Sequence, residues 1–266
     1  MRPAIICHMA TAIDGRLHPS RFTPAAEGIS AAVLRGHYEQ VADRLGADGW
    51  IVGRKTMSEI SKASARRIAE VSTTVREPHV GDRKGRSLAV AIDRSGRTHY
   101  GRDHIGGDHV VAVLGEQVSD AYLAELREDG VSYVFAGPTG HDLPTAMAQL
   151  FAIFGVKKLL LEGGGKINGA FLKQRLIDEF STLIFPAVDG LAGTESIDDY
   201  EGTDGMRTGE GRALRLIGCE TLEGAWSGCV TPSRTRFRRP SNDERTSPHT
   251  RSLEANGGDC GACRPN

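Results

Sequence analysis

Three consecutive glycines, Gly163, Gly164 and Gly165, stand in the segment LEGGGKING at residues 161–169. Glycine loses more conformational freedom on folding than any other residue, so a triplet indicates that another backbone or a ligand approaches closely. The triplet lies between an apolar run at 157–161 and a helical pattern, and a helix that begins where a parallel strand ends offers free N–H groups to an anion. The pattern therefore predicts a phosphate site, with a tight turn or close packing of helix on strand as the alternative.

A second segment, Gly53, Arg54, Lys55 and Thr56, repeats this arrangement because it also follows an apolar stretch and opens a helical one. Arginine offers a bidentate fork to phosphate, lysine a point charge, and threonine a helix cap or a donor. The alternative is an ordinary capped helix with solvated basic side chains. Two helix starts that suit phosphate indicate a dinucleotide, although neither segment matches the GxGxxG or P-loop pattern.

Two acidic residues stand at the ends of predicted strands and are candidates for a role in the site. Glu162 ends a buried strand, where a carboxylate needs partners, and it directly precedes the glycines. Asp14 precedes Gly15 after the first strand, and an Asp-Gly pair at such a place is a strong turn signal. His8, inside that strand, is interpreted as a core residue.

The elements that must position these residues alternate between strand and helix along the chain. This alternation predicts an α/β fold with a mostly parallel sheet. Strands are expected at residues 4–9, 50–52, 87–92, 109–114, 131–135, 157–161, 180–185 and 213–218. Helices are expected at residues 30–45, after Thr56, and at 117–127, 143–154 and 167–174, with a surface loop at 186–212.

Composition limits the class of protein. The 266 residues are 39% hydrophobic with a formal net charge of -1, so we expect one principal domain and no sequence-independent binding to nucleic acid. The seven-residue apolar stretch near the N-terminus is broken by His8, which argues against a membrane span and favours the cytoplasm.

The cysteines predict neither a disulfide framework nor a metal site. Their number is five, which is odd, and they are scattered along the chain. Cys260 and Cys263 form a CxxC, but no second ligand pair stands at a suitable spacing for zinc.

Three segments together resemble a known family. ATAIDGRL at 10–17, WIVGRKT at 50–56 and LLLEGGGKINGAFLKQRLIDEF at 159–180 are similar to the reductase domain of riboflavin biosynthesis, a member of the dihydrofolate-reductase-like superfamily. The resemblance spans roughly residues 3 to 224, and EGGG with LIDEF is its most specific part. It implies a mixed α/β sheet with antiparallel C-terminal strands, and NADPH-dependent reduction of the ribosyl group of 5-amino-6-(5-phosphoribosylamino)uracil to a ribityl chain.

The resemblance also implies roles for individual residues. The glycine triplet with Lys166, Ile167 and Asn168 would hold the NADPH pyrophosphate, while Gly53 and Thr56 would contact the cofactor from the other side. Arg54 and Lys55 would meet its 2′-phosphate, and Thr11 or Phe22 would border the nicotinamide. Glu162, Ser20 and Arg44 would meet the substrate. Asp14 would lie near the reacting centre, where it or a water that it holds would donate a proton to the reduced nitrogen, with the turn as the alternative role of this residue. Relatives also suggest a homodimer.

The sequence departs from the family at three places. We expect the reductase alone, without the zinc deaminase domain that precedes it in many members, and Phe22 stands where tryptophan is common. After residue 224 the family's apolar ending of the type GGVVWLRYR is missing. Residues 225–266 instead contain seven arginines and only two residues of Val, Ile and Leu, which predicts disorder.

We hypothesise that residues 225–266 are out-of-frame translation. One coding string for GVVWLRYR, taken from its second letter, encodes AWSGCVT, which is the sequence of residues 225–231. A reductase of the same fold that acts on another pterin or pyrimidine, and a nucleotide-binding protein without turnover, stay open as alternative functions.

Overall fold

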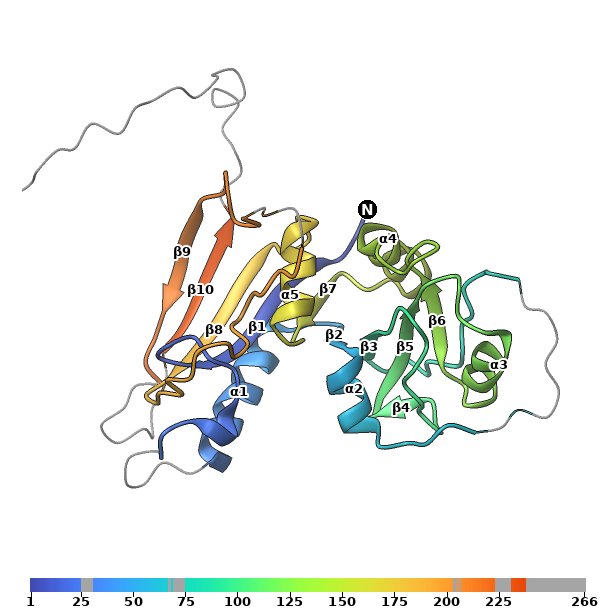
Figure 1. Ribbon diagram of the computed structural model, residues 1–266, viewed down its shortest axis with the longest axis horizontal. Helices are drawn as coiled ribbons and strands as arrows, with labels where there is room; N and C mark the ends of the chain where they lie inside the picture. Colours follow the sequence, from blue (N-terminus) through green and yellow to red (C-terminus); the bar gives the residue numbers. More distant parts are fainter. Residues whose placement is uncertain are drawn as a thin grey trace, which may run out of the picture.

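The computed structural model of the chain is built around one ten-stranded sheet (Figure 1). It describes residues 1–24, 31–66, 68, 75–202, 205, 207–222 and 231–237. The strand order is β4-β5-β3-β2-β7-β1-β8-β10-β9, and β6 also pairs with β5. The strands are β1 (Ala4–Ala12), β2 (Gly49–Gly53), β3 (Leu88–Ile92), β4 (His104–Ile105), β5 (Asp108–Leu114), β6 (Ser132–Phe135), β7 (Lys158–Leu161), β8 (Glu179–Phe185), β9 (Leu214–Cys219) and β10 (Thr231–Phe237).

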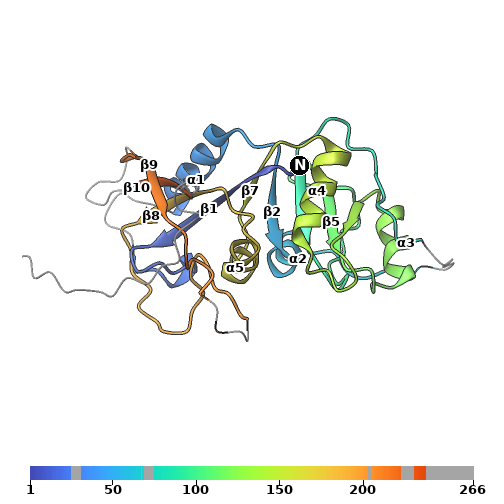
Figure 2. The same cartoon turned by 90° about the horizontal axis from the view of Figure 1, so that it is seen from above.

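Helices cover both faces of this sheet. They are α1 (Ala31–Leu45), α2 (Arg54–Ser61), α3 (Asp120–Glu128), α4 (Leu143–Phe154) and α5 (Gly165–Lys173), and a short 3-10 helix lies at Pro19–Arg21. The buried side chains of α4 and α5 share one core cluster, whereas α1, α2 and α3 pack in two others. Figure 2 shows α1 and α5 on opposite sides of β1.

The central strands are mostly apolar, and residues on both of their faces are buried. In β1, Ile5 and Cys7 face the cluster of α4 and α5, while Ile6 faces the cluster of α1. All five residues of β3 are buried. Continuous apolar runs of this kind are typical of parallel strands covered by helices on both sides.

The predicted fold class is confirmed. The pairs among β1, β2, β3, β5, β6, β7 and β8 are parallel, and β10 runs antiparallel to both β8 and β9. The sequence analysis missed the two-residue strand β4, which pairs with β5 across a tight connection. None of the helices among the described residues is long and apolar enough to cross a membrane.

The expectation of disorder after residue 224 is wrong for residues 231–237, which form β10. This strand pairs with β8 from Thr231 opposite Ile184 to Arg236 opposite Glu179. Amino-acid composition indicates only how much apolar area a segment can bury. The edge of β8 also offers backbone donors and acceptors, with which almost any extended segment can form hydrogen bonds. Residues 238–266, including Cys260 and Cys263, lie outside the described residues.

Candidate functional site

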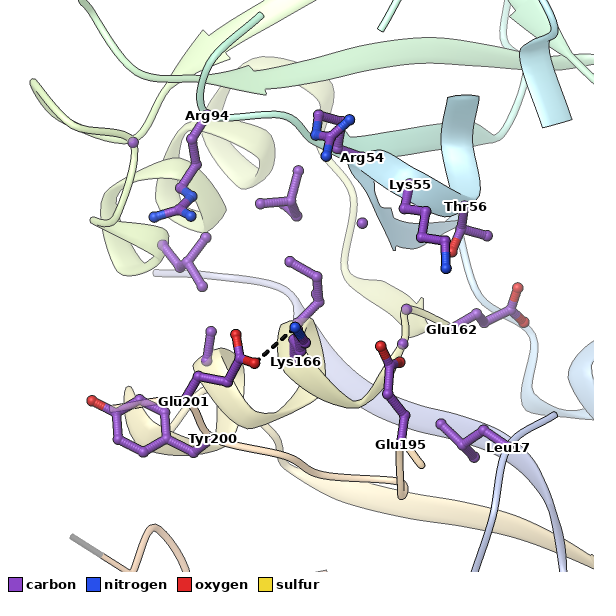
Figure 3. A pocket seen from close by; sticks show the side chains of 18 of the residues that line it. Leu17, Arg54, Lys55, Thr56, Arg94, Glu162, Lys166, Glu195, Tyr200 and Glu201 are labelled. Carbon is purple, nitrogen blue, oxygen red and sulfur yellow. Dashed lines mark ion pairs between the residues drawn. The ribbon is translucent and has the colours of Figure 1, made fainter. Parts of the chain in front are cut away.

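A cavity of about 840 Å³ opens where β2, β3 and β7 end (Figure 3). Carboxyl ends of parallel strands are the usual place for ligands in such sheets. Its wall comes from the first turns of α2 and α5, the turn after β3, the segment before α4 and the loop after β8. The lining residues include Met9, Leu17, His18, Gly53, Arg54, Lys55, Thr56, Arg94, Ser95, Gly140, His141, Glu162, Gly163, Gly164, Lys166, Ile167, Glu195, Tyr200 and Glu201.

Two helices point uncapped N-termini at this cavity. The N-cap residues of α2 and α5 are Gly53 and Gly164, and neither helix has a side-chain cap. By contrast, Ser119 caps α3 by accepting from the Tyr122 N–H, and Asp142 caps α4 in the same way. An uncapped N-terminus leaves backbone N–H groups and a partial positive charge for an anionic ligand.

Cationic side chains surround the same space. Arg54, Lys55 and Arg94 line it, and none of them forms an ion pair with any residue that the structure describes. The Lys166 Nζ lies 2.7 Å from Glu201 Oε1, so this cation is already paired. The cavity is therefore suited to a ligand with several negative charges.

The three glycines of the triplet differ in what they contact. Gly163 and Gly164 line the cavity, but Gly165 does not. A Cβ on Gly165 would collide with the carbonyl oxygen of Ser196, and the Asp199 N–H donates to the Gly165 carbonyl at 2.9 Å. Gly165 thus lets the loop after β8 pack against α5, a close approach of backbone that differs from the predicted packing of helix on strand.

Ile167 and Asn168, which were also predicted to hold the pyrophosphate, lie in different places. Ile167 lines the cavity and packs on Gly53, where an added Cβ would lie 2.7 Å from Ile167 Cγ1. Asn168 is buried away from the cavity, and its Nδ2 donates to the Ile197 carbonyl at 2.7 Å. Asn168 therefore holds the loop after β8 against α5.

Glu162 enters the cavity directly after β7. Its backbone N–H donates to the Ile51 carbonyl at 2.8 Å, which ties it to the neighbouring strand β2. Burial raises the pKa of its carboxyl from 4.5 to about 7, and the nearby Tyr38 hydroxyl lowers it only in part. A carboxyl of this kind can hold a proton near neutral pH.

Asp14 has the opposite environment. It lies in an exposed turn outside the cavity, and the Gly190 N–H donates to its Oδ2 at 2.8 Å. This hydrogen bond lowers the pKa of the Asp14 carboxyl. The turn, which the sequence analysis offered as one alternative, is thus what the structure shows.

Four other predicted residues do not line the cavity. The Thr11 hydroxyl is buried and donates to the Ala12 carbonyl at 2.9 Å, and Phe22 packs against the core cluster of α1. Ser20 is exposed in the 3-10 helix. Arg44 forms an ion pair with Glu220 at 2.7 Å on the surface.

Several lining residues were missed. Arg94 and Ser95 lie one residue after the end of β3, behind Asp93, and this resembles the cation that follows β2 at Arg54, so the sequence carried a usable signal for them. Glu195 and Glu201 come from the long loop after β8 and have no such signal. A Cβ built on Gly164 would lie 2.8 Å from Glu195 Oε2, so this carboxylate lies beside the N-terminus of α5.

Comparisons with known proteins agree with this architecture. The family model of the RibD C-terminal domain matches residues 3–226. The 2,5-diamino-6-ribosylamino-4(3H)-pyrimidinone 5′-phosphate reductase of Methanothermobacter thermautotrophicus is 28% identical over 209 residues, covering 77% of this chain and 88% of the relative. The protein of the same name from Aquifex aeolicus is 26% identical over 206 residues, covering 77% and 85%.

A solved structure shows the same fold. The pyrimidine reductase-like protein of Corynebacterium diphtheriae superposes with a TM-score of 0.60 at 16% identity, covering 90% of this chain and 93% of the other. The family match over residues 3–226 confirms the resemblance inferred from the sequence. The chain belongs to the RibD C-terminal domain family.

Proposed function

We propose that this protein is an NADPH-dependent reductase that converts the ribosyl group of a phosphorylated ribosylaminopyrimidine into a ribityl chain, as in riboflavin biosynthesis. The observation that carries the proposal is the meeting of two uncapped helix N-termini and three unpaired cations, among the described residues, at one cavity. The names of the relatives from M. thermautotrophicus and A. aeolicus support the reaction class.

The cavity suits a phosphorylated dinucleotide. Gly163, Gly164 and the N-terminus of α5 would hold the pyrophosphate, with Gly53 and Thr56 on the opposite wall. Arg54, Lys55 and Arg94 would meet the additional 2′-phosphate, because unpaired cations bind phosphate more readily than the paired Lys166. Figure 3 shows Arg94 and Glu162 at opposite ends of the cavity, as an elongated ligand requires.

Glu162 is our candidate for the proton donor. NADPH, when bound, would supply the hydride that reduces the sugar carbon of the open-chain imine, and a residue of the protein would then have to give a proton to the imine nitrogen. The Glu162 carboxyl lines the cavity and has a pKa of about 7, so it can hold that proton near neutral pH. Asp14 has a lowered pKa and lies outside the cavity, which makes it a poorer donor.

Two substrates differ at one ring position. The resemblance implies the uracil, whereas the relatives are named for the 2,5-diaminopyrimidinone, which carries an amino group where the uracil carries an oxygen. Both carry the ribosyl 5′-phosphate. We therefore propose the phosphorylated ribosylaminopyrimidine as the substrate class.

The test follows NADPH oxidation by nicotinamide absorbance with purified protein. Both pyrimidines are offered as substrates, with dihydrofolate and NADH as controls. Turnover of either ribosylaminopyrimidine with NADPH supports the proposal. Turnover of dihydrofolate alone would replace it by another reductase of this fold, and tight NADPH binding without any turnover would replace it by a nucleotide-binding protein.

We also propose that the protein forms a homodimer. Strand β9 lies at the edge of the sheet and exposes Leu214, Leu216 and Ile217 by 54%, 60% and 42%. An exposed apolar edge strand is an aggregation risk unless another surface covers it. Sedimentation equilibrium tests this, and a monomer at micromolar concentration would contradict it.

A further inference from the structure

The turn after β3 is braced from inside the protein. The carboxylate of Asp93 is fully buried, and its Oδ2 accepts from the backbone N–H groups of Arg97 and Thr98, each at 2.7 Å. The Tyr122 hydroxyl donates to the Thr98 carbonyl at 2.7 Å and lies 3.3 Å from the same Asp93 oxygen. These bonds fix the backbone that carries Arg94 into the cavity.

On its outer side this turn is in close contact with Gly140. Gly140, which precedes α4, has a φ of +75°, and a Cβ at this position would lie 2.7 Å from Arg94 Cβ, 2.8 Å from its Cγ and 3.0 Å from its Cα. The Gly115 N–H also donates to the Arg94 carbonyl at 2.9 Å. Gly140 and Arg94 both line the cavity, and Figure 3 shows the Arg94 guanidinium directed into it.

We propose that Gly140 is a positioning residue for Arg94, and that through this contact it sets the preference for a dinucleotide with an additional phosphate. The inference rests on the proposed function, in which Arg94 meets the 2′-phosphate. Arg94 has no ion-pair partner in the described part of the chain, so packing of its stem is what orients the guanidinium. Because the Asp93 and Gly115 hydrogen bonds hold the Arg94 backbone, any side chain at position 140 must displace the stem or the whole turn.

The chain offers a matched control for this contact. Gly85 has a φ of +72° in a turn at the start of β3, and nothing lies within 4 Å of the Cβ that would be added there. Gly85→Ala therefore imposes nearly the same backbone strain as Gly140→Ala without the collision. Gly85 is not among the residues that line the cavity.

The experiment measures dissociation constants of NADPH and NADH for the wild type, Gly140→Ala, Gly85→Ala, Arg94→Ala and the double variant Gly140→Ala with Arg94→Ala. Gly140→Ala should weaken NADPH binding about tenfold and leave NADH binding unchanged, since it misplaces one charge-assisted contact. Arg94→Ala should do the same, the double variant should lose no further discrimination, and Gly85→Ala should match the wild type.

Several outcomes would overturn the inference. An unchanged NADPH to NADH ratio in Gly140→Ala, with a reduced ratio in Arg94→Ala, would make Gly140 a purely structural residue. An unchanged ratio in Arg94→Ala would remove the role of Arg94 and the inference with it. Wild-type protein that binds neither dinucleotide would instead reject the proposed function. If Gly140→Ala does not fold, Gly140→Asn with Gly85→Asn repeats the test, because asparagine tolerates positive φ better.

Discussion

At the scale of single residues, the two candidate carboxyls are separated by their surroundings. Burial raises the pKa of Glu162 to about 7, while a backbone hydrogen bond lowers the pKa of Asp14 in an exposed turn. Both are acidic residues beside a glycine in the sequence. The pKa values differ because Glu162 is removed from water, whereas Asp14 accepts a hydrogen bond from a backbone N–H.

Glu162 should make stability depend on pH. Its pKa is raised on folding from 4.5 to about 7, so the carboxyl adds no penalty below pH 4.5, and the protein loses stability as pH rises to about 7. Glu162→Gln should therefore match the wild type at pH 4.5 and exceed it at pH 8 by up to about 3 kcal/mol. Urea unfolding at both pH values measures this.

Asp198 provides a check on that result. Burial also raises the pKa of its carboxyl to about 7, so Asp198→Asn should add a further gain in stability at pH 8 to that of Glu162→Gln. His8, His79 and His109 have lowered pKa values and act in the opposite direction, so each variant is compared with the wild type at the same pH. A difference between Glu162→Gln and the wild type that does not grow between pH 4.5 and pH 8 would contradict the assignment.

Substitutions of Glu162 and Asp14 should have different effects on activity. Glu162→Gln should lower kcat by at least about a hundredfold, since it removes the proton donor, whereas Asp14→Asn should change it by less than about threefold. Steady-state NADPH oxidation measures both. A hundredfold loss in Asp14→Asn, with little loss in Glu162→Gln, would exchange the two roles.

At the scale of elements, two carboxylates lie near the N-terminus of α5, where we propose that the ligand's phosphates bind. The Glu195 carboxylate lies beside Gly164, and Glu201 pairs with Lys166. A negative charge at a helix N-terminus is favourable by itself, but here it competes with the phosphates of a ligand for the same N–H groups.

Glu195→Gln should therefore tighten NADPH binding by about two- to fivefold, because one like charge leaves the phosphate site. Isothermal titration calorimetry gives the affinity. The control is Glu210→Gln, since Glu210 is exposed, pairs with Arg207 and does not line the cavity. Weaker binding in Glu195→Gln alone would show that this carboxylate assists the ligand.

At the scale of the whole molecule, β10 joins the sheet core to its last edge. It pairs with β8 on one side and β9 on the other, and the structure shows no direct pairing of β8 with β9. Removing β10 would leave the backbone groups of β8 and β9 without these partners.

A chain that ends at residue 224 should therefore be less stable than one that ends at residue 237, by several kcal/mol. Thermal unfolding compares the two with the full chain. Equal melting temperatures for the two truncated chains would show that β10 contributes nothing.

The out-of-frame hypothesis belongs to this scale as well. A chain with the GGVVWLRYR ending in place of residues 225–266 should melt at a higher temperature than the full chain, because apolar residues would then pack where the present strand is TPSRTRF. Resequencing the locus tests the frame itself, and an intact frame would refute the hypothesis.

The sequence by itself determined the class of fold and the two helix starts at which we expect phosphate to bind. Alternating apolar runs and helical patterns are local, and so are the glycines and cations that open α2 and α5, so these features could be predicted from spacing alone. The family resemblance added the expected chemistry of hydride transfer, which no local pattern contains.

Only the tertiary structure decided which side chains face the cavity. Gly165 and Asn168 stand in the same segment as Gly163 and Gly164, but the loop after β8 packs over the first two and leaves the others open. Arg94 reaches the cavity because its turn packs on Gly140, 46 residues later in the chain. Such contacts join distant segments, and the sidedness of a residue depends on that packing rather than on its neighbours in sequence.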